Sequence, residues 1–84
     1  SASHLLDPRT GRPVEHDLIA VNAFAPTARD ADAWATALMI LGPVEGVKKA
    51  EELDMVARFC SIQNGHIEIS LSTAYERLYV SNIP

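Results

Sequence analysis

Two oxygen-bearing side chains, Asp32 and Thr36, stand four residues apart in a segment whose apolar residues recur at helical spacing. They would lie one turn apart on one helix face, and the small residues Ala28 and Ala35 share or border that stripe with Met39. Mg²⁺ prefers hard oxygen ligands, takes one or two from the protein, and completes its octahedron with phosphate oxygens and water. The pair is therefore a candidate magnesium site. A structural role fits the same spacing, because aspartate near a helix N-terminus suits the helix dipole and a helical threonine often bonds back to a carbonyl.

A second candidate group is the imidazole of His4, which stands three residues before Asp7. An unperturbed imidazole titrates near pH ~6.5, so His4 is a plausible general base at neutral pH, with Asp7 as a neighbour that could orient it. Arg9 and Arg12 flank Gly11 and could meet a phosphate. Taken alone, His4 fits a solvated residue near the start of the chain better than a base, and Arg9 and Arg12 fit a solvated turn better than a phosphate site. The three histidines have no zinc-site spacing.

The amino-acid composition of the chain argues against several classes of function. The chain of 84 residues is 48% hydrophobic and 21% charged, which predicts one small packed domain spanning residues 1–84. The net charge of −4 and the scattered lysines and arginines argue against a nucleic-acid partner. No apolar run approaches the ~20 residues that span a bilayer, and the start of the chain does not look like a signal peptide. The single cysteine, Cys60, excludes an internal disulfide and is interpreted as a packed, inert thiol.

The first half of the chain predicts a turn, a strand and two helices. Residues 7–13 include residue types that favour tight turns, so we expect the chain to reverse there. This turn would join an apolar stretch at residues 4–6 to a strand at residues 17–25. That strand is apolar on both faces, as expected when helices or another sheet cover it. Thr27 and Asp30 fit a capping box. The helix that follows would span residues 28–41 and end at Gly42, and a second helix would span residues 43–53.

The second half predicts a β-hairpin. Asn64-Gly65 is a strong signal for a type I′ turn, with strands at residues 55–63 and 66–72 on either side. In the second strand Ile67, Ile69 and Leu71 alternate with polar residues, so we expect one buried face and one wet face. The tail from residue 73 to 84 fits either a short helix capped at Thr73 or an irregular return.

The order of these elements favours an α+β fold. Strand, turn, strand, helix, helix, strand, turn and strand pack most simply as an antiparallel sheet with both helices on one face, because each element must cover its apolar side.

Two segments together resemble a known family. Residues 4–13 read HLLDPRTGRP, and residues 31–38 read ADAWATAL, preceded by Ala25-Pro26-Thr27 and closed by Leu41-Gly42. In this order and separation they closely resemble the HxxDPxTGxP and ADAxATAL motifs of the ApbE family. The resemblance extends in weaker form over nearly the whole chain. The element order also resembles the T-fold half (β2-α2-β2) from which that family is built.

The resemblance implies a magnesium-dependent FAD:protein FMN transferase, with Mg²⁺ and FAD as cofactors. Asp32 and Thr36 would be the side-chain ligands of the magnesium that grips the FAD pyrophosphate. His4 would take the proton from a Thr or Ser hydroxyl of an acceptor protein, whose oxygen would attack the phosphorus on the FMN side and release AMP. His4, Asp7 and Thr10 would also contact the cofactor.

Several features leave other readings open. A full family member is several times longer, which indicates a C-terminal fragment that is inactive without its N-terminal part. Trp34 replaces the more usual leucine, and Asn22 interrupts a strand that is usually more apolar. A non-catalytic T-fold binding or assembly module, homo-oligomeric or not, and a variant that hydrolyses FAD remain alternatives. By resemblance the parent protein would be periplasmic or a membrane-anchored lipoprotein, with a cytoplasmic location also open.

Overall fold

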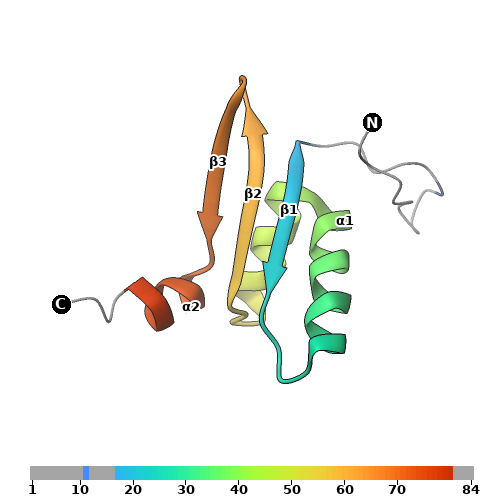
Figure 1. Ribbon diagram of the computed structural model, residues 1–84, viewed down its shortest axis with the longest axis vertical. Coiled ribbons are helices and arrows are strands. Elements are labelled where there is room, and N and C mark those ends of the chain that lie inside the picture. The colour runs from blue at the N-terminus through green and yellow to red at the C-terminus, as the bar shows by residue number, and fades with distance from the viewer. Residues whose placement is uncertain (1–10, 12–16, 81–84) are drawn as a thin grey trace.

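The structure is a computed structural model that describes residue 11 and residues 17–80, and it has the predicted α+β architecture. Its sheet has three antiparallel strands in the order β1-β2-β3, namely β1 (Leu18–Ala23), β2 (Ala57–Gln63) and β3 (His66–Leu71). The long helical element α1 (Ala28–Glu52) covers one face of this sheet, as Figure 1 shows. The predicted stretch at residues 4–6 lies outside the described residues. Within the described part of the chain, no helix is long and apolar enough to cross a membrane.

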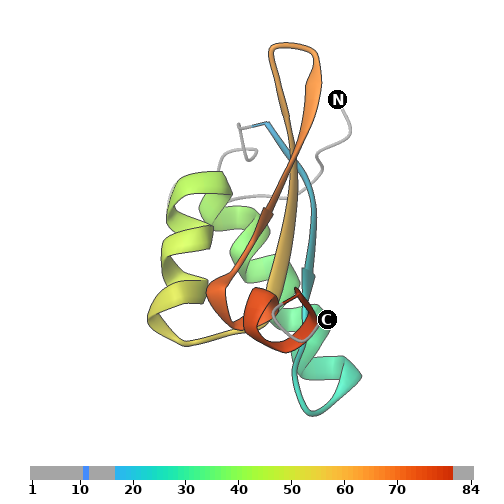
Figure 2. The same cartoon turned by 90° about the vertical axis from the view of Figure 1, so that its left-hand side faces the viewer.

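The element α1 consists of two helical halves, as the sequence predicted. Gly42 has φ 90° and ψ −179°, a conformation that only glycine adopts readily, and Pro43 then begins the second half. Figure 2 shows the two halves running up and back down on the same side of the sheet. Thr27 caps the first half, with its Oγ1 accepting a hydrogen bond of 3.1 Å from the Asp30 backbone N–H. The return bond expected from the Asp30 carboxylate is absent among the described residues, so the capping box is only half formed.

The core lies between α1 and the first two strands. Its buried members come from both halves of α1 and from β1 and β2: Leu18, Leu38, Ala50, Ala57 and Phe59. Val21, Val47 and Met55 pack against them from the rim. The first half of α1 and the sheet are therefore held together as one unit, which fixes the orientation of every side chain on that half.

Gly46 allows the second half of α1 to pack tightly on the first. A Cβ at this position would lie 2.7 Å from the Leu38 carbonyl oxygen and 3.3 Å from the Phe59 ring. We expect Gly46→Ala to lower the free energy of unfolding by about 1–3 kcal/mol, because the clash is with backbone that cannot move without separating the helices. Urea unfolding measures this effect. Val44→Ala, at a side chain that is 75% exposed, is the control, and equal stabilities for the two variants would contradict the prediction.

The hairpin between β2 and β3 has the predicted turn but not the predicted burial. Asn64 and Gly65 have φ of 51° and 78°, as a type I′ turn requires. However, Ile67 and Ile69 are 66% and 44% exposed, so the expectation of a buried face on β3 was wrong. The reason is that α1 packs against β1 and β2, and the hairpin extends beyond the helices, as Figure 2 shows. The apolar residues of β3 lie on the opposite side of the sheet.

The tail begins with a short helix, α2 (Thr73–Tyr75), which continues as a π-helical segment at Glu76–Val80. Its cap is Ser72 rather than the predicted Thr73. The buried Ser72 hydroxyl donates to the Met55 carbonyl (2.6 Å) and accepts from the backbone N–H groups of Ala57 (3.0 Å) and Tyr75 (3.2 Å). A single side chain thus joins the start of β2 to the start of α2.

A carboxylate also ties α2 to the end of α1. The Thr73 backbone N–H donates to Glu51 Oε2 at 2.7 Å. This hydrogen bond lowers the pKa of Glu51 below its usual value, because it favours the charged form. The contact therefore stabilises the fold above the ordinary pKa of a glutamate and is lost as the pH falls through the lowered one.

Candidate functional site

Asp32 and Thr36 lie on the first half of α1, on the flank of the stripe that packs against the sheet. Leu38 is fully buried in that stripe, whereas both candidate ligands are exposed. The Thr27 cap and the packing of Leu38 fix the rotation of this half about its axis, so the two oxygens face the same way one turn apart. Neither side chain has a hydrogen-bond or ion-pair partner among the described residues. The structural role that the sequence left open for Thr36, a bond back to a carbonyl, is therefore absent there.

The donor set fits magnesium only in part. One carboxylate and one hydroxyl are hard oxygens, the kind that Mg²⁺ binds. The described residues hold no cluster of three or more His, Cys, Asp or Glu side chains that would suit a metal ion. Because Mg²⁺ usually takes only one or two protein ligands beside phosphate oxygens and water, this pair fits a site that a bound phosphate compound completes.

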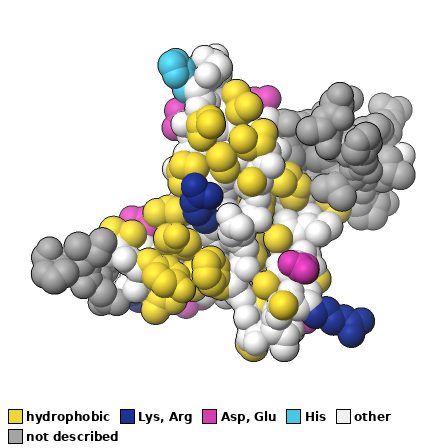
Figure 3. Space-filling view, viewed as in Figure 1, with side chains coloured by type: hydrophobic (Ala, Val, Ile, Leu, Met, Phe, Trp, Pro, Cys, Tyr) yellow, Lys and Arg dark blue, Asp and Glu magenta, His cyan; other side chains and the backbone are white. Residues whose placement is uncertain are grey.

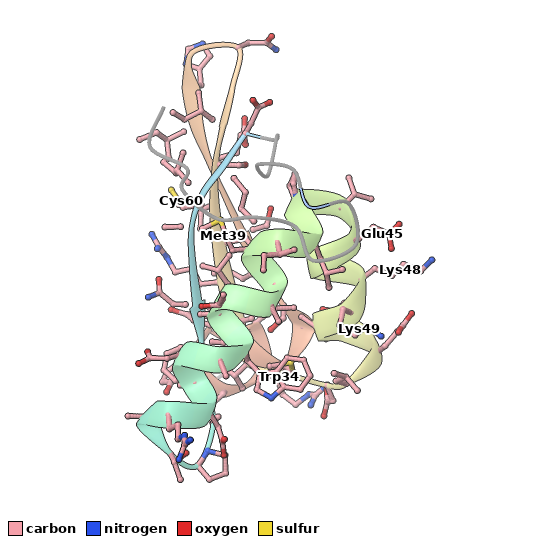
Figure 4. The ribbon with its side chains drawn as sticks, turned by 90° about the vertical axis from the view of Figure 1, so that its right-hand side faces the viewer. Trp34, Met39, Glu45, Lys48, Lys49 and Cys60 are labelled. Carbon is pink, nitrogen blue, oxygen red and sulfur yellow. The ribbon has the colours of Figure 1, made fainter. Side chains whose placement is uncertain are left out.

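Trp34 lies on the other flank of the same helix. Two residues correspond to about 200° around an α-helix, so the ring points away from Asp32. Figure 4 shows Trp34 extending toward the lower end of the second half of α1, while Met39 points toward the sheet. Trp34 lines an open groove of about 390 Å³ together with residues of the β1–α1 and α1–β2 connections: Phe24, Ala25, Pro26, Leu53, Asp54, Met55 and Val56. The rotation of the helix therefore places the Trp34 ring away from the candidate ligands.

A second open groove, of about 420 Å³, lies on the helix side of the β2–β3 hairpin. Its lining is mostly polar and comes from the start of the second half of α1 and from the hairpin: Pro43, Val44, Ser61, Asn64, Glu68 and Ser70. Neither groove includes Asp32 or Thr36.

The remaining sequence-predicted site residues are not placed by the structure. His4, Asp7, Thr10, Arg9 and Arg12 all lie outside the described residues. Their assignment to the site stays a prediction that depends on the family resemblance.

One polar residue in an unusual setting was missed by the sequence analysis. Arg58 points to the face of the sheet that α1 leaves uncovered, where its neighbours on β2 are Cys60 and Ile62. The available signal was a charged residue inside a strand pattern that is otherwise apolar.

Comparison with known proteins finds relatives with similar sequences. The chain is 57% identical over 51 residues to the FAD:protein FMN transferase of Escherichia coli K12, a match that covers 61% of this chain and 13% of that protein. It is 34% identical over 77 residues to the FAD:protein FMN transferase of Haemophilus influenzae, covering 90% of this chain and 22% of that protein. The chain thus spans less than a quarter of the length of these curated relatives.

Solved structures agree with the sequence matches. The apo form of the flavinyl transferase ApbE of Pseudomonas stutzeri superposes with a TM-score of 0.90 at 34% identity, over 96% of this chain and 26% of that one. The flavin transferase ApbE of Vibrio cholerae gives a TM-score of 0.84 at 26% identity, over 92% and 25%. The sequence model of the ApbE family matches residues 1–59, which include both motifs noted in the sequence. This chain belongs to the ApbE family.

Proposed function

We propose that this chain is the C-terminal part of a magnesium-dependent FAD:protein FMN transferase. In this proposal Asp32 and Thr36 hold Mg²⁺ on the outer flank of α1, and the metal, when bound, neutralises charge on the FAD pyrophosphate. His4 removes the proton from the acceptor Thr or Ser hydroxyl. The hydroxyl oxygen then bonds to the FMN phosphorus, the bond to the bridging oxygen breaks, and AMP leaves. Asp7 and Thr10 contact the cofactor beside His4.

The observation that carries the proposal is the geometry of Asp32 and Thr36. Their two oxygens are exposed, one helical turn apart and without a competing partner in the described part of the chain. A structural aspartate and threonine would more often be engaged with the helix or with a neighbouring side chain. The chain belongs to a family whose named relatives are FAD:protein FMN transferases. A metal ion on these oxygens would assist such a transfer by neutralising charge on the pyrophosphate of FAD.

The activity is best tested in a grafted enzyme, in which residues 1–84 replace the matching segment of the Pseudomonas stutzeri transferase. We expect this protein to attach FMN to an acceptor protein when FAD and Mg²⁺ are present, with one AMP released for each flavin attached. Flavin fluorescence of the acceptor in a denaturing gel and chromatography of the nucleotides measure the two products. The 84-residue chain alone should be inactive.

Two outcomes would contradict the proposal. Release of free FMN and AMP without labelling of any acceptor would assign FAD hydrolysis instead. A folded grafted enzyme that binds no FAD would show that this chain does not complete a flavin site.

A further inference from the structure

The sheet has a second apolar face, on the side away from α1. We call it the outer face and define it by the residues whose register places them there: Ala20, Asn22, Arg58, Cys60, Ile62, Ile67, Ile69 and Leu71. Figure 3, which looks onto this side, shows hydrophobic side chains gathered over the strands. Figure 4 shows Cys60 on the opposite side of the strands from α1.

The outer face exposes more apolar side chain than is usual for a sheet face that remains in contact with water. Ile62, Ile67 and Ile69 are each more than 40% exposed, and Cys60, which the sequence analysis took as a packed thiol, is only half-buried. Strands that are wet on one face normally carry polar residues there. Here the polarity of β3 is reversed, because Glu68 and Ser70 lie on the helix side and the isoleucines lie on the outer face.

The apolar surface continues past the end of the strands. Phe24, Tyr75 and Tyr79 form a ring cluster, with centroid distances of 6.0, 5.7 and 5.1 Å, and Phe24 and Tyr79 are 47% and 48% exposed. Figure 3 shows this second hydrophobic group on the same side of the molecule, next to α2. Contiguous apolar patches of this kind mark contact surfaces in soluble proteins.

Arg58 adds a requirement on whatever covers the face. Arg58 as a residue is half-buried within the outer face, and its side chain has no ion pair or hydrogen bond to another described residue. Covering it without a partner would leave a buried, unpaired charge, which is strongly unfavourable. The covering layer must therefore be apolar and bring a carboxylate or carbonyl oxygen opposite Arg58.

A second copy of the chain meets this requirement poorly. A two-fold dimer through the outer face sets like surfaces together, and with its axis close to Arg58 it would bring the two like-charged guanidinium groups against each other. The family comparison offers another occupant, since this chain matches only 26% of the Pseudomonas stutzeri transferase.

We propose that the outer face is the surface on which the rest of the transferase polypeptide docks, through an apolar layer with a hydrogen-bond acceptor opposite Arg58. This rests on the proposed function only in taking the chain as part of a longer transferase. It requires neither magnesium nor FMN transfer.

The reactivity of the Cys60 thiol measures whether the outer face is covered, because Cys60 lies in this face and pairs with Ile69 on the neighbouring strand. We expect N-ethylmaleimide to alkylate Cys60 at least about tenfold more slowly in the grafted enzyme than in the 84-residue chain, as followed by peptide mass spectrometry. Ile69→Lys in the grafted enzyme should raise the rate toward that of the chain alone. Ser70→Lys, the same change one residue along β3 but on the helix side, should leave Cys60 protected. Ile67→Lys, nearer the hairpin tip, is a milder variant in case Ile69→Lys prevents folding.

Equal alkylation in the chain and in the grafted enzyme would overturn the proposal. So would protection that appears only at concentrations where sedimentation shows a dimer, because a second copy would then be the occupant. If the graft does not fold, the chain is titrated with a Pseudomonas stutzeri transferase lacking the matching segment. Saturable protection of Cys60 would then support the proposal, and an unchanged rate would overturn it. A grafted enzyme with protected Cys60 but no FMN transfer would contradict the proposed function and leave this inference standing.

Discussion

Asp32→Asn in the grafted enzyme is expected to weaken Mg²⁺ binding and FMN transfer together. The change removes the negative charge while keeping the shape of the side chain, and hard cations are held largely by charge. We expect the apparent affinity for Mg²⁺ to fall by at least about 10–100-fold, the range found for groups that only orient a metal ligand. Transfer rates measured over a series of Mg²⁺ concentrations give both quantities, and excess Mg²⁺ should restore part of the rate.

Asp30→Asn is the matched control for this variant. Asp30 carries the same charge on the same helix, two residues away and so on a different face. Its substitution should leave the Mg²⁺ dependence unchanged and alter only the helix-dipole contribution to stability, by about 0.3–1 kcal/mol. If Asp32→Asn transfers FMN at the normal rate with normal Mg²⁺ dependence, Asp32 and Thr36 are not metal ligands.

Two substitutions of Thr36 distinguish a role as a metal ligand from a role in packing, in the same assay. Thr36→Val keeps the shape and removes the oxygen, so it should act in the same direction as Asp32→Asn but less severely, because a neutral hydroxyl contributes less than a carboxylate. Thr36→Ser keeps the oxygen and should retain most of the activity. A loss of activity in Thr36→Ser with normal activity in Thr36→Val would indicate that the methyl group rather than the hydroxyl matters.

The parts of the fold that the sequence predicted are those with local signals. The break between the halves of α1 follows from Gly42 and Pro43, whose backbone preferences leave few alternatives. The hairpin follows from Asn64-Gly65, which adopts the positive φ values that its turn requires. In both cases the information lies within two adjacent residues, so no knowledge of tertiary packing was needed.

The predictions that were wrong concern features that depend on packing between distant segments. The alternation in β3 was correct, but its direction relative to α1 depends on pairing with β2, which no pattern within β3 contains. Ser72 was overlooked as a cap because its value comes from contacts with Met55 and Ala57, about sixteen positions earlier in the chain. Sequence periodicity shows that a face is apolar and does not show which element covers it.

The candidate site also has a part that local sequence predicts and a part that it does not. The helical spacing of Asp32 and Thr36 places their oxygens together, and the structure has the two side chains exposed on one flank. Nothing in the spacing brings His4 to them, because a predicted turn and the strand β1 intervene. Its role comes from the family motif alone, which makes His4 the residue whose function an experiment must decide.

His4→Ala in the grafted enzyme is expected to lower FMN transfer by about 10²–10⁴-fold, the usual effect of losing a general base. Mg²⁺ dependence and FAD affinity should stay nearly intact, because a base acts on the acceptor hydroxyl rather than on the metal or the pyrophosphate. The transfer rate of the grafted enzyme without this substitution should also rise with pH as the imidazole of His4 loses its proton. This rise should disappear in His4→Ala. His66→Ala, an exposed histidine on β3, controls for the loss of an imidazole elsewhere in the chain. Weakened Mg²⁺ and FAD binding in His4→Ala, at the level seen for Asp32→Asn, would instead make His4 part of the binding site and leave the base to be found outside this chain.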